Sequence, residues 1–241
     1  MTDIGRLVSA ASMGLIVLVG TGCDLASRTP SETGAETTPP TAEPSAQSVQ
    51  VFPSAGLLAT GERHAVVTVE GVAFSLEVPS SSWISNGSFL IEGHPGSPDE
   101  TEMFFWTGPY PSGVYADPCG GSPAAPAGPS AGDLAGAMAA VPGLEVVAEP
   151  SDVTVGGLPA KYVELRTPED AECSAGSFFL WYFLDGGEEV PRYVTWLGST
   201  IRAWIIEVDG VRVLIEAETR PGETAEIAPE ILEIIDSIQF D

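Results

Sequence analysis

The feature that restricts the fold of this chain most strongly is a two-residue turn near its C-terminus. Asp209-Gly210 separates two runs rich in β-branched and aromatic residues, 201–208 and 211–217. A type I′ turn needs positive φ angles at both central residues, and Asp-Gly adopts them readily. The pattern therefore predicts an antiparallel hairpin, and with it a sheet of antiparallel strands.

Other segments predict further strands and two helices. Alternating or apolar runs bounded by turn residues predict strands at 64–70, 72–78, 88–91, 102–107, 153–155, 158–165, 177–184 and 192–197. Ala-rich residues 131–141 predict a helix, and isoleucines at helical spacing predict a C-terminal helix with Pro229 in its first turn. The element order indicates an α+β fold: a single antiparallel sheet with both helices packed on one face and the other face in water.

The first 22 residues have the layout of a signal peptide. Arg6 precedes an apolar run, 7–19, which is shorter than the roughly 20 residues that a membrane span needs. The following Gly20-Thr21-Gly22-Cys23 resembles a bacterial lipobox, although Gly20 stands where Leu or Val is usual. The resemblance implies that Cys23 becomes the N-terminus and carries a diacylglycerol. The alternative is an ordinary signal peptide followed by an accidental cysteine.

These features divide the chain into three parts. Residues 1–22 are expected to be a lipoprotein signal peptide, 23–53 a lipid-anchored tether, and 54–241 one globular domain. The tether is rich in Ser, Thr, Pro and Glu and nearly free of large apolar residues, so it cannot offset the loss of chain entropy and is expected to be disordered. The expected location is the extracytoplasmic face of the cell membrane.

The cysteines and the net charge narrow the class of protein further. With Cys23 acylated, Cys119 and Cys173 are expected to form a disulfide in an oxidising compartment, because neither has a nearby His or second Cys for metal binding.

The net charge is −25. So acidic a chain repels phosphate backbones and anionic lipids, which excludes nucleic acid as a partner and leaves membrane attachment to the lipid.

Motifs for catalysis or metal binding are missing from the sequence. The two histidines, His64 and His94, form no clustered metal spacing, and no Gly-x-Ser-x-Gly elbow or Gly-rich phosphate loop occurs. Acidic residues gather at 94–102 and 185–189 without EF-hand spacing, and no carboxylate pair stands out for glycoside hydrolysis. We therefore expect no enzyme, no metal and no cofactor.

Residues 178–184, Phe-Phe-Leu-Trp-Tyr-Phe-Leu, are apolar on both alternating faces. Either this strand is covered on both sides or one of its faces is an open apolar patch. In the second case, aromatic residues on neighbouring predicted strands would extend the apolar patch. The candidate binding surface consists of Trp181, Trp196, Trp204 and Tyr193.

Several segments resemble PsbP/Mog1-like domains. Residues 72–79 followed by Trp83 resemble the opening strand of that family, 152–160 its central strand pair, and 231–240 its terminal helix. Tyr115-Ala-Asp-Pro-Cys119 with a later cysteine is similar to exported actinobacterial lipoproteins of unknown function. The resemblance covers most of 64–241 and implies a fold for binding and assembly without a shared catalytic constellation.

Three functions follow from these observations. The favoured one is a non-enzymatic, lipid-anchored module that binds an unidentified protein or small molecule through an exposed aromatic surface. The second is a cell-envelope hydrolase, which predicts two carboxylates converging in a pocket with one of them desolvated. The third is a structural envelope protein, which predicts a compact domain without a sizeable pocket.

Overall fold

The computed structural model describes residues 52–68, 71–93, 96, 100–106, 111–173, 176–185, 187–221 and 228–241. The chain divides into two compact units, Met1–Ala46 and Gln47–Asp241, and every described residue belongs to the second. The predicted signal peptide, the lipid site at Cys23 and most of the tether lie outside the described residues. In the part that is described, no helix has the length and apolar character of a membrane span.

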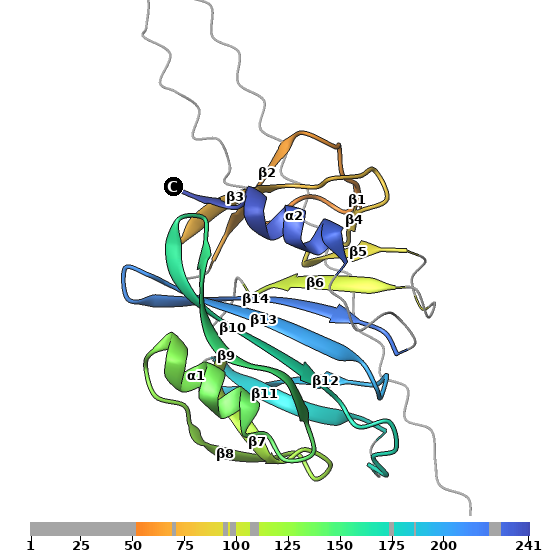
Figure 1. Cartoon of the computed structure of the whole chain (residues 1–241), viewed down its shortest axis with the longest axis vertical. Coiled ribbons are helices and arrows are strands. Elements are labelled where there is room, and N and C mark those ends of the chain that lie inside the picture. The colour runs from red at the N-terminus through yellow and green to blue at the C-terminus, as the bar shows by residue number, and fades with distance from the viewer. Residues whose placement is uncertain are drawn as a thin grey trace, which may run out of the picture. The chain divides into compact units, whose positions relative to one another are not determined.

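Three antiparallel sheets and two helices make up the described fold (Figure 1). The largest sheet has eight strands, in the spatial order β1 (Gly56–Leu57), β4 (Ile84–Ser85), β5 (Phe89–Glu92), β6 (Thr101–Phe105), β14 (Val211–Thr219), β13 (Thr200–Val208), β10 (Leu158–Arg166) and β9 (Glu145–Val155). A four-stranded sheet has the order β12 (Glu188–Val194), β11 (Phe178–Asp185), β7 (Pro111–Asp117) and β8 (Ser122–Pro126). The third contains β15 (Gln239–Phe240), β3 (Ala73–Glu77) and β2 (Arg63–Val67); the helices are α1 (Ala131–Ala139) and α2 (Pro229–Ser237).

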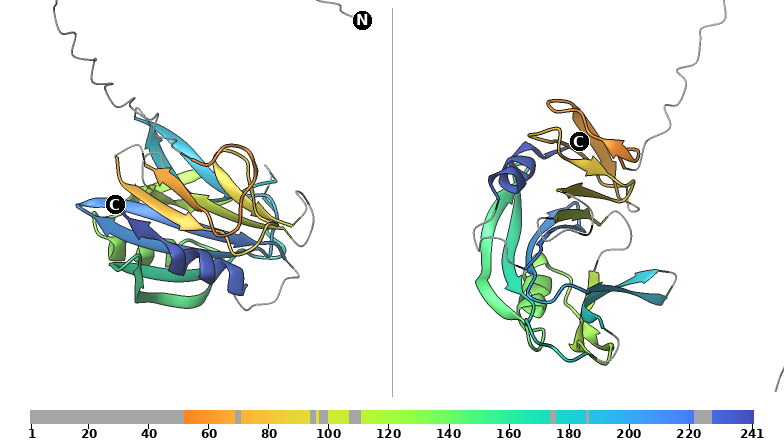
Figure 2. Two further views of the ribbon diagram at one scale, coloured as in Figure 1. Left: turned by 90° about the horizontal axis from the view of Figure 1, so that it is seen from above. Right: turned by 90° about the vertical axis from the view of Figure 1, so that its right-hand side faces the viewer.

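The two smaller sheets lie at opposite ends of the eight-stranded sheet, and α1 lies between the eight-stranded and four-stranded sheets (Figures 1 and 2). Two apolar cores result. In the first core, Trp204 of β13 packs with α2 and the three-stranded sheet, whereas in the second core Ile205 packs with α1 and Trp181 of β11. Successive residues of β13 point to opposite faces and are nearly all buried, so this central strand of the eight-stranded sheet is covered on both sides.

The predicted single sheet with helices on one face and water on the other is wrong, and with it the fold expected from the PsbP/Mog1 resemblance. Two strands of the four-stranded sheet, β7 and β8, come from a segment rich in Pro, Gly and Ala that carries little strand signal. The charged side chains of β14 do not face water. Glu216 and Glu218 are instead buried and paired with Arg192 from the four-stranded sheet.

Several local predictions are confirmed. Asp209 and Gly210 have φ angles of 50° and 84° and join β13 to β14. Helix α1 begins after Ser130, whose side chain accepts a hydrogen bond from the Asp133 amide while Asp133 accepts one from the Ser130 amide. The C-terminal helix begins at Pro229 as predicted. The strand expected at 192–197 instead spans Glu188–Val194.

Candidate functional site

The four aromatic residues of the predicted binding surface do not lie together. Trp181 is fully buried in the second core and Trp204 is 4% exposed in the first, so neither contributes to a surface, and the prediction is wrong for both. Trp181 is buried because its face of β11 packs into the second core, and Trp204 is buried because its face of β13 packs into the first. Tyr193 is 45% exposed and Trp196 is 39% exposed, as a surface role requires.

A different set of rings lines the face of the four-stranded sheet that is turned away from α1, here called the outer face. Tyr115 packs against Phe179 and Tyr182, with ring centroids 5.2 and 5.8 Å apart, and Phe179 packs against Tyr193 at 5.7 Å. These four rings form a continuous ladder across β7, β11 and β12. Tyr115 and Tyr182 are each only 3% exposed, so the ladder reaches the surface at its Phe179–Tyr193 end.

A β-bulge brings the ladder together. The register of β11 and β12 shifts between Phe179 and Trp181, so Phe179 and Tyr182 share a face although they are three residues apart. The ring of Tyr182 lies over Gly113, where a Cβ atom would be 2.5 Å from the phenolic oxygen. The Tyr182 hydroxyl donates a hydrogen bond to the Ala124 carbonyl, at 3.2 Å. Glycine at 113 therefore makes room for the ladder.

Carboxylates surround the ladder at the β11–β12 turn. Asp185, Glu188 and Glu189 are exposed, and none forms an ion pair with a described residue. Burial raises the pKa of Tyr115 and of Tyr182, and the negative charge of Glu189 raises the pKa of both further. The turn therefore places uncompensated negative charge beside the tyrosine rings.

The opposite, inner face of the same hairpin carries a buried ionic anchor that the sequence did not reveal. Arg192 contacts Glu216 at 2.5 Å and Glu218 at 2.6 Å, and its guanidinium lies 4.6 Å from the centre of the Phe104 ring. Trp106 donates a hydrogen bond from Nε1 to Glu216, at 3.2 Å. Burial raises the pKa of Glu216. These contacts join β12 to the eight-stranded sheet and fix the position of the hairpin.

A second ionic cluster lies at the end of β6. Arg220 is 3.1 Å from Glu100 and 3.8 Å from Glu102, and it stacks 4.5 Å from the Trp196 ring centre. Burial raises the pKa of Glu102 to about 7, helped by its hydrogen bond with Glu100 and by the charge of Glu218. Burial also opposes ionisation of Glu100, but its hydrogen bonds and Arg220 outweigh this and lower its pKa.

This carboxylate pair differs from a glycosidase site. Glu100 and Glu102 share a hydrogen bond, whereas the two catalytic carboxyl groups of glycosidases stand about 5 Å or more apart. Arg220 also contacts both carboxylates, so the pair is engaged within the protein. The geometry describes an internal charge cluster that holds one proton near neutral pH.

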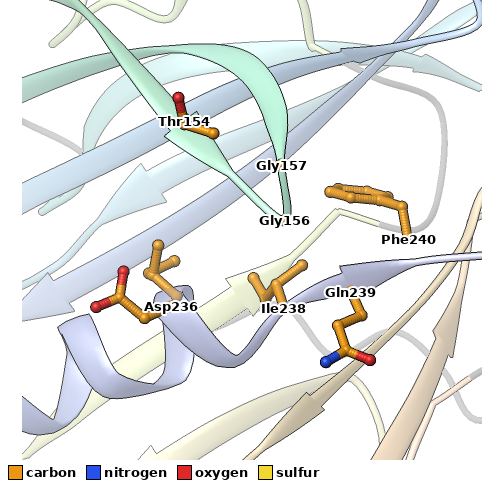
Figure 3. Close-up of a pocket in the computed structure, with 8 residues that line it drawn as sticks. Thr154, Gly156, Gly157, Asp236, Ile238, Gln239 and Phe240 are labelled. Carbon is orange, nitrogen blue, oxygen red and sulfur yellow. The ribbon is translucent and has the colours of Figure 1, made fainter.

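The described cavities lie elsewhere. A hollow of about 490 Å³ lies between the β9–β10 turn at Gly156-Gly157 and the end of α2, where Asp236, Ile238 and Phe240 line it (Figure 3). Smaller ones of about 410, 360 and 220 Å³ are lined by other residues than the ladder or the Glu100–Glu102 pair. The largest hollow exceeds what the purely structural hypothesis predicted. Gly156 is required there because a Cβ would lie 2.7 Å from the Phe240 ring.

The predicted disulfide is confirmed, and it lies beside the ladder. Cys119 and Cys173 are bonded, with their Cα atoms 4.7 Å apart. Cys119 follows β7 and Cys173 precedes β11, and the Phe179 amide donates a hydrogen bond to the Pro118 carbonyl, at 2.9 Å. The bond therefore ties together two strands that carry the aromatic rings.

Some of the residues considered as metal ligands lie outside the described part of the chain. Within the described ranges, no group of three or more His, Cys, Asp or Glu side chains is placed to hold a metal ion. His64 lies on β2 with Nε2 3.2 Å from the Ala59 carbonyl. His94 and most of the acidic loop around it lie outside the described residues.

No protein family model and no curated protein matches this chain. Among solved structures, the chain is weakly similar to LpqN, a protein involved in cell envelope biogenesis of Mycobacterium tuberculosis. The two share 11% sequence identity with a TM-score of 0.38, over 74% of this chain and 90% of LpqN. A similarity at this level establishes neither a common fold nor a common function.

Proposed function

We propose that this protein is an exported, lipid-anchored binding module of the cell envelope that performs no catalysis. Cys23 carries the lipid on the extracytoplasmic side of the membrane, and the outer face of the four-stranded sheet is the contact surface. The Phe179–Tyr193 end of the aromatic ladder is partly exposed and is bordered by carboxylates that have no ion-pair partner among the described residues, and this observation carries the binding role.

The address is supported by two independent features of the chain. The apolar run and the small residues before Cys23 form a lipoprotein-like signal. The Cys119–Cys173 bond is of the kind that persists in oxidising compartments outside the cytoplasm. A disulfide and a lipid-bearing cysteine use all three cysteines of the chain.

The arrangement of charges supports binding over hydrolysis. The desolvated carboxyl of Glu102 is held by Glu100 and Arg220, and the buried pair of Glu216 and Glu218 is held by Arg192. Each carboxylate with a raised pKa therefore has an internal partner, whereas the exposed aromatic and acidic side chains of the β11–β12 hairpin do not.

The test of the anchoring is the intact mass of the protein extracted from membranes of its native host, with and without reductant. We expect the mass of residues 23–241 plus acyl chains, and a mass lower by two hydrogens before reduction. Cys23→Ala is the matched control and should release the protein from the membrane fraction. A mature chain that begins at another residue and carries no lipid would refute the anchored module.

A further inference from the structure

The surface of the domain is more acidic than its composition suggests. Seven of the nine Lys and Arg residues are described, and four of these are buried: Arg192, Arg202, Arg212 and Arg220. The three others are each paired with a carboxylate of this chain: Arg63 with Glu77, Lys161 with Asp152, and Arg166 with Glu145. The described cations are thus committed to internal partners, and much of the acidic surface is left without a counter-charge.

The excess of negative over positive surface charge is concentrated at the four-stranded sheet. Arg192 is the single cationic residue in its four strands, and it points inward to Glu216 and Glu218. The carboxylates of the β11–β12 turn therefore lie on a sheet that offers them no cation. On the outer face, Leu184 is 41% exposed opposite Glu189, so an acidic and an apolar group lie on the same face as Tyr193.

These side chains suit a partner that is both cationic and apolar. The face of a tyrosine ring attracts a guanidinium or ammonium group, and a charge-assisted hydrogen bond to a carboxylate adds to this attraction. Tyr193 and Glu189 lie on the same outer face of β12, two positions on either side of Pro191, so different basic side chains of one extended segment can reach the two groups. The net charge of the chain also steers basic partners toward it.

The open edge of β12 is a less suitable docking place than the outer face. It is the first strand of its sheet, so one side of it lacks a strand partner among the described elements. Pro191 lacks an amide hydrogen for a new ladder, and proline and charge on an edge strand oppose strand addition. We therefore assign the outer face.

We propose that the outer face of the four-stranded sheet docks a basic segment of a partner polypeptide, which stacks on Tyr193 and pairs with Glu189. The inference rests on the proposed function and gives its contact surface a partner chemistry. The ionic anchor of Arg192 and the Cys119–Cys173 bond hold this face rigid, so the surface needs little reordering on binding.

The test uses the full chain in detergent and three probes: short peptides with arginine at alternate positions, the same peptides with glutamate, and an uncharged glucose oligosaccharide. Affinities are measured at about 0.15 M ionic strength. We expect the arginine peptides to bind and the other probes not to bind. Tyr193→Ala and Glu189→Gln should each weaken binding about tenfold.

Two controls separate docking from general attraction to an acidic protein. Leu232→Ala removes an exposed apolar group from α2, and Glu149→Gln removes an exposed carboxylate from β9. Both should leave the affinity unchanged, and Tyr193→Phe should retain it because the ring is kept.

Three results would overturn the proposal. Arginine peptides that bind no better than glutamate peptides would exclude a basic partner. Equal losses in the site and control variants would leave only general charge attraction. Tyr193-dependent binding of the oligosaccharide would assign the face to carbohydrate instead. The peptide test does not need acylated Cys23, so its failure is distinguishable from failure of the anchoring test.

Discussion

The two faces of the β11–β12 hairpin have similar side chains and different surroundings. The inner face presents Trp181, Phe183 and Arg192, which are all buried against the eight-stranded sheet and its second core. The outer face presents Phe179, which is partly buried, and Tyr193, which is 45% exposed. The difference shows that on this hairpin the aromatic content does not decide what is core. The charge partners decide it, because Arg192 has two carboxylates to meet on the inner side.

The largest effect should come from breaking the inner face. Arg192→Ala leaves Glu216 and Glu218 buried without their cation, and removing one member of a buried ion pair costs about 3–5 kcal/mol of unfolding free energy. Arg192→Lys should cost less, because it keeps the charge but loses the two-pronged contact. Denaturant unfolding measures both. The control, Arg166→Ala, removes a more exposed pair and should cost about 1 kcal/mol or less. Equal costs for Arg192→Ala and Arg166→Ala would refute the anchor.

The next effect concerns the covalent tie beside the outer face. Replacing both Cys119 and Cys173 with serine opens a loop with a sequence separation of 54, which should lower the unfolding free energy by about 4 kcal/mol in the chain-entropy model. Hydrogen exchange should accelerate first in β7 and β11, the strands next to the two cysteines. Uniform acceleration over all three sheets would show that the bond does not act locally on this sheet.

The Glu100–Glu102 cluster predicts a dependence of stability on pH. Folding raises the pKa of Glu102 from 4.5 to about 7, so the folded protein holds a proton that the unfolded chain has released. This contribution to stability is fully present below about pH 4.5 and is lost as the pH rises to about 7, at up to about 1.4 kcal/mol per pH unit. Glu102→Gln imitates the protonated form, so its stability should exceed that of the natural protein at about pH 8 and match it near pH 4.5. The control is Glu149→Gln. A stability difference for Glu102→Gln that does not change with pH would contradict the shift.

The smallest effect on stability should come from the outer face. Tyr193→Ala removes a half-exposed ring whose main contact is Phe179, and we expect a loss of about 1 kcal/mol or less in unfolding free energy. A melting curve close to that of the natural protein, together with lost peptide binding, would sharpen the distinction between the two faces. A loss as large as that of Arg192→Ala would show that Tyr193 belongs to the core.

The sequence predicted the local elements better than their assembly. Asp209-Gly210, the Ala-rich helix and the isoleucine spacing carry their signals within a few residues, and the two non-lipid cysteines had one obvious partner each. Strand β8 of the four-stranded sheet, Ser122–Pro126, contains no β-branched or aromatic residue that would predict a strand. The burial of Glu216 and Glu218 on β14 could not be predicted, because their partner Arg192 lies far away in sequence, on another sheet.

The candidate site was predicted only in part. Residues 178–184 were identified as the aromatic strand, and the exposure of Tyr193 and Trp196 agrees with the prediction. The ladder itself was missed. Strict alternation would place Phe179 on the same face as Trp181. The bulge between them moves Phe179 to the face of Tyr182, and no residue type in this segment predicts that bulge. Gly113 is the one signal that could have pointed to a close-packed ring, since it interrupts β7 beside Val114 and Tyr115.

The claim that the outer face is a contact surface and the inner face is structural can be tested directly by hydroxyl-radical labelling. Labelling of the purified chain is compared with labelling of the same protein in native membranes. We predict that Tyr193 and Leu184 react in the purified chain and are protected in the membranes, whereas the exposed Leu232 of α2 reacts equally in both. Tyr193 reacting equally in both preparations would contradict an occupied outer face.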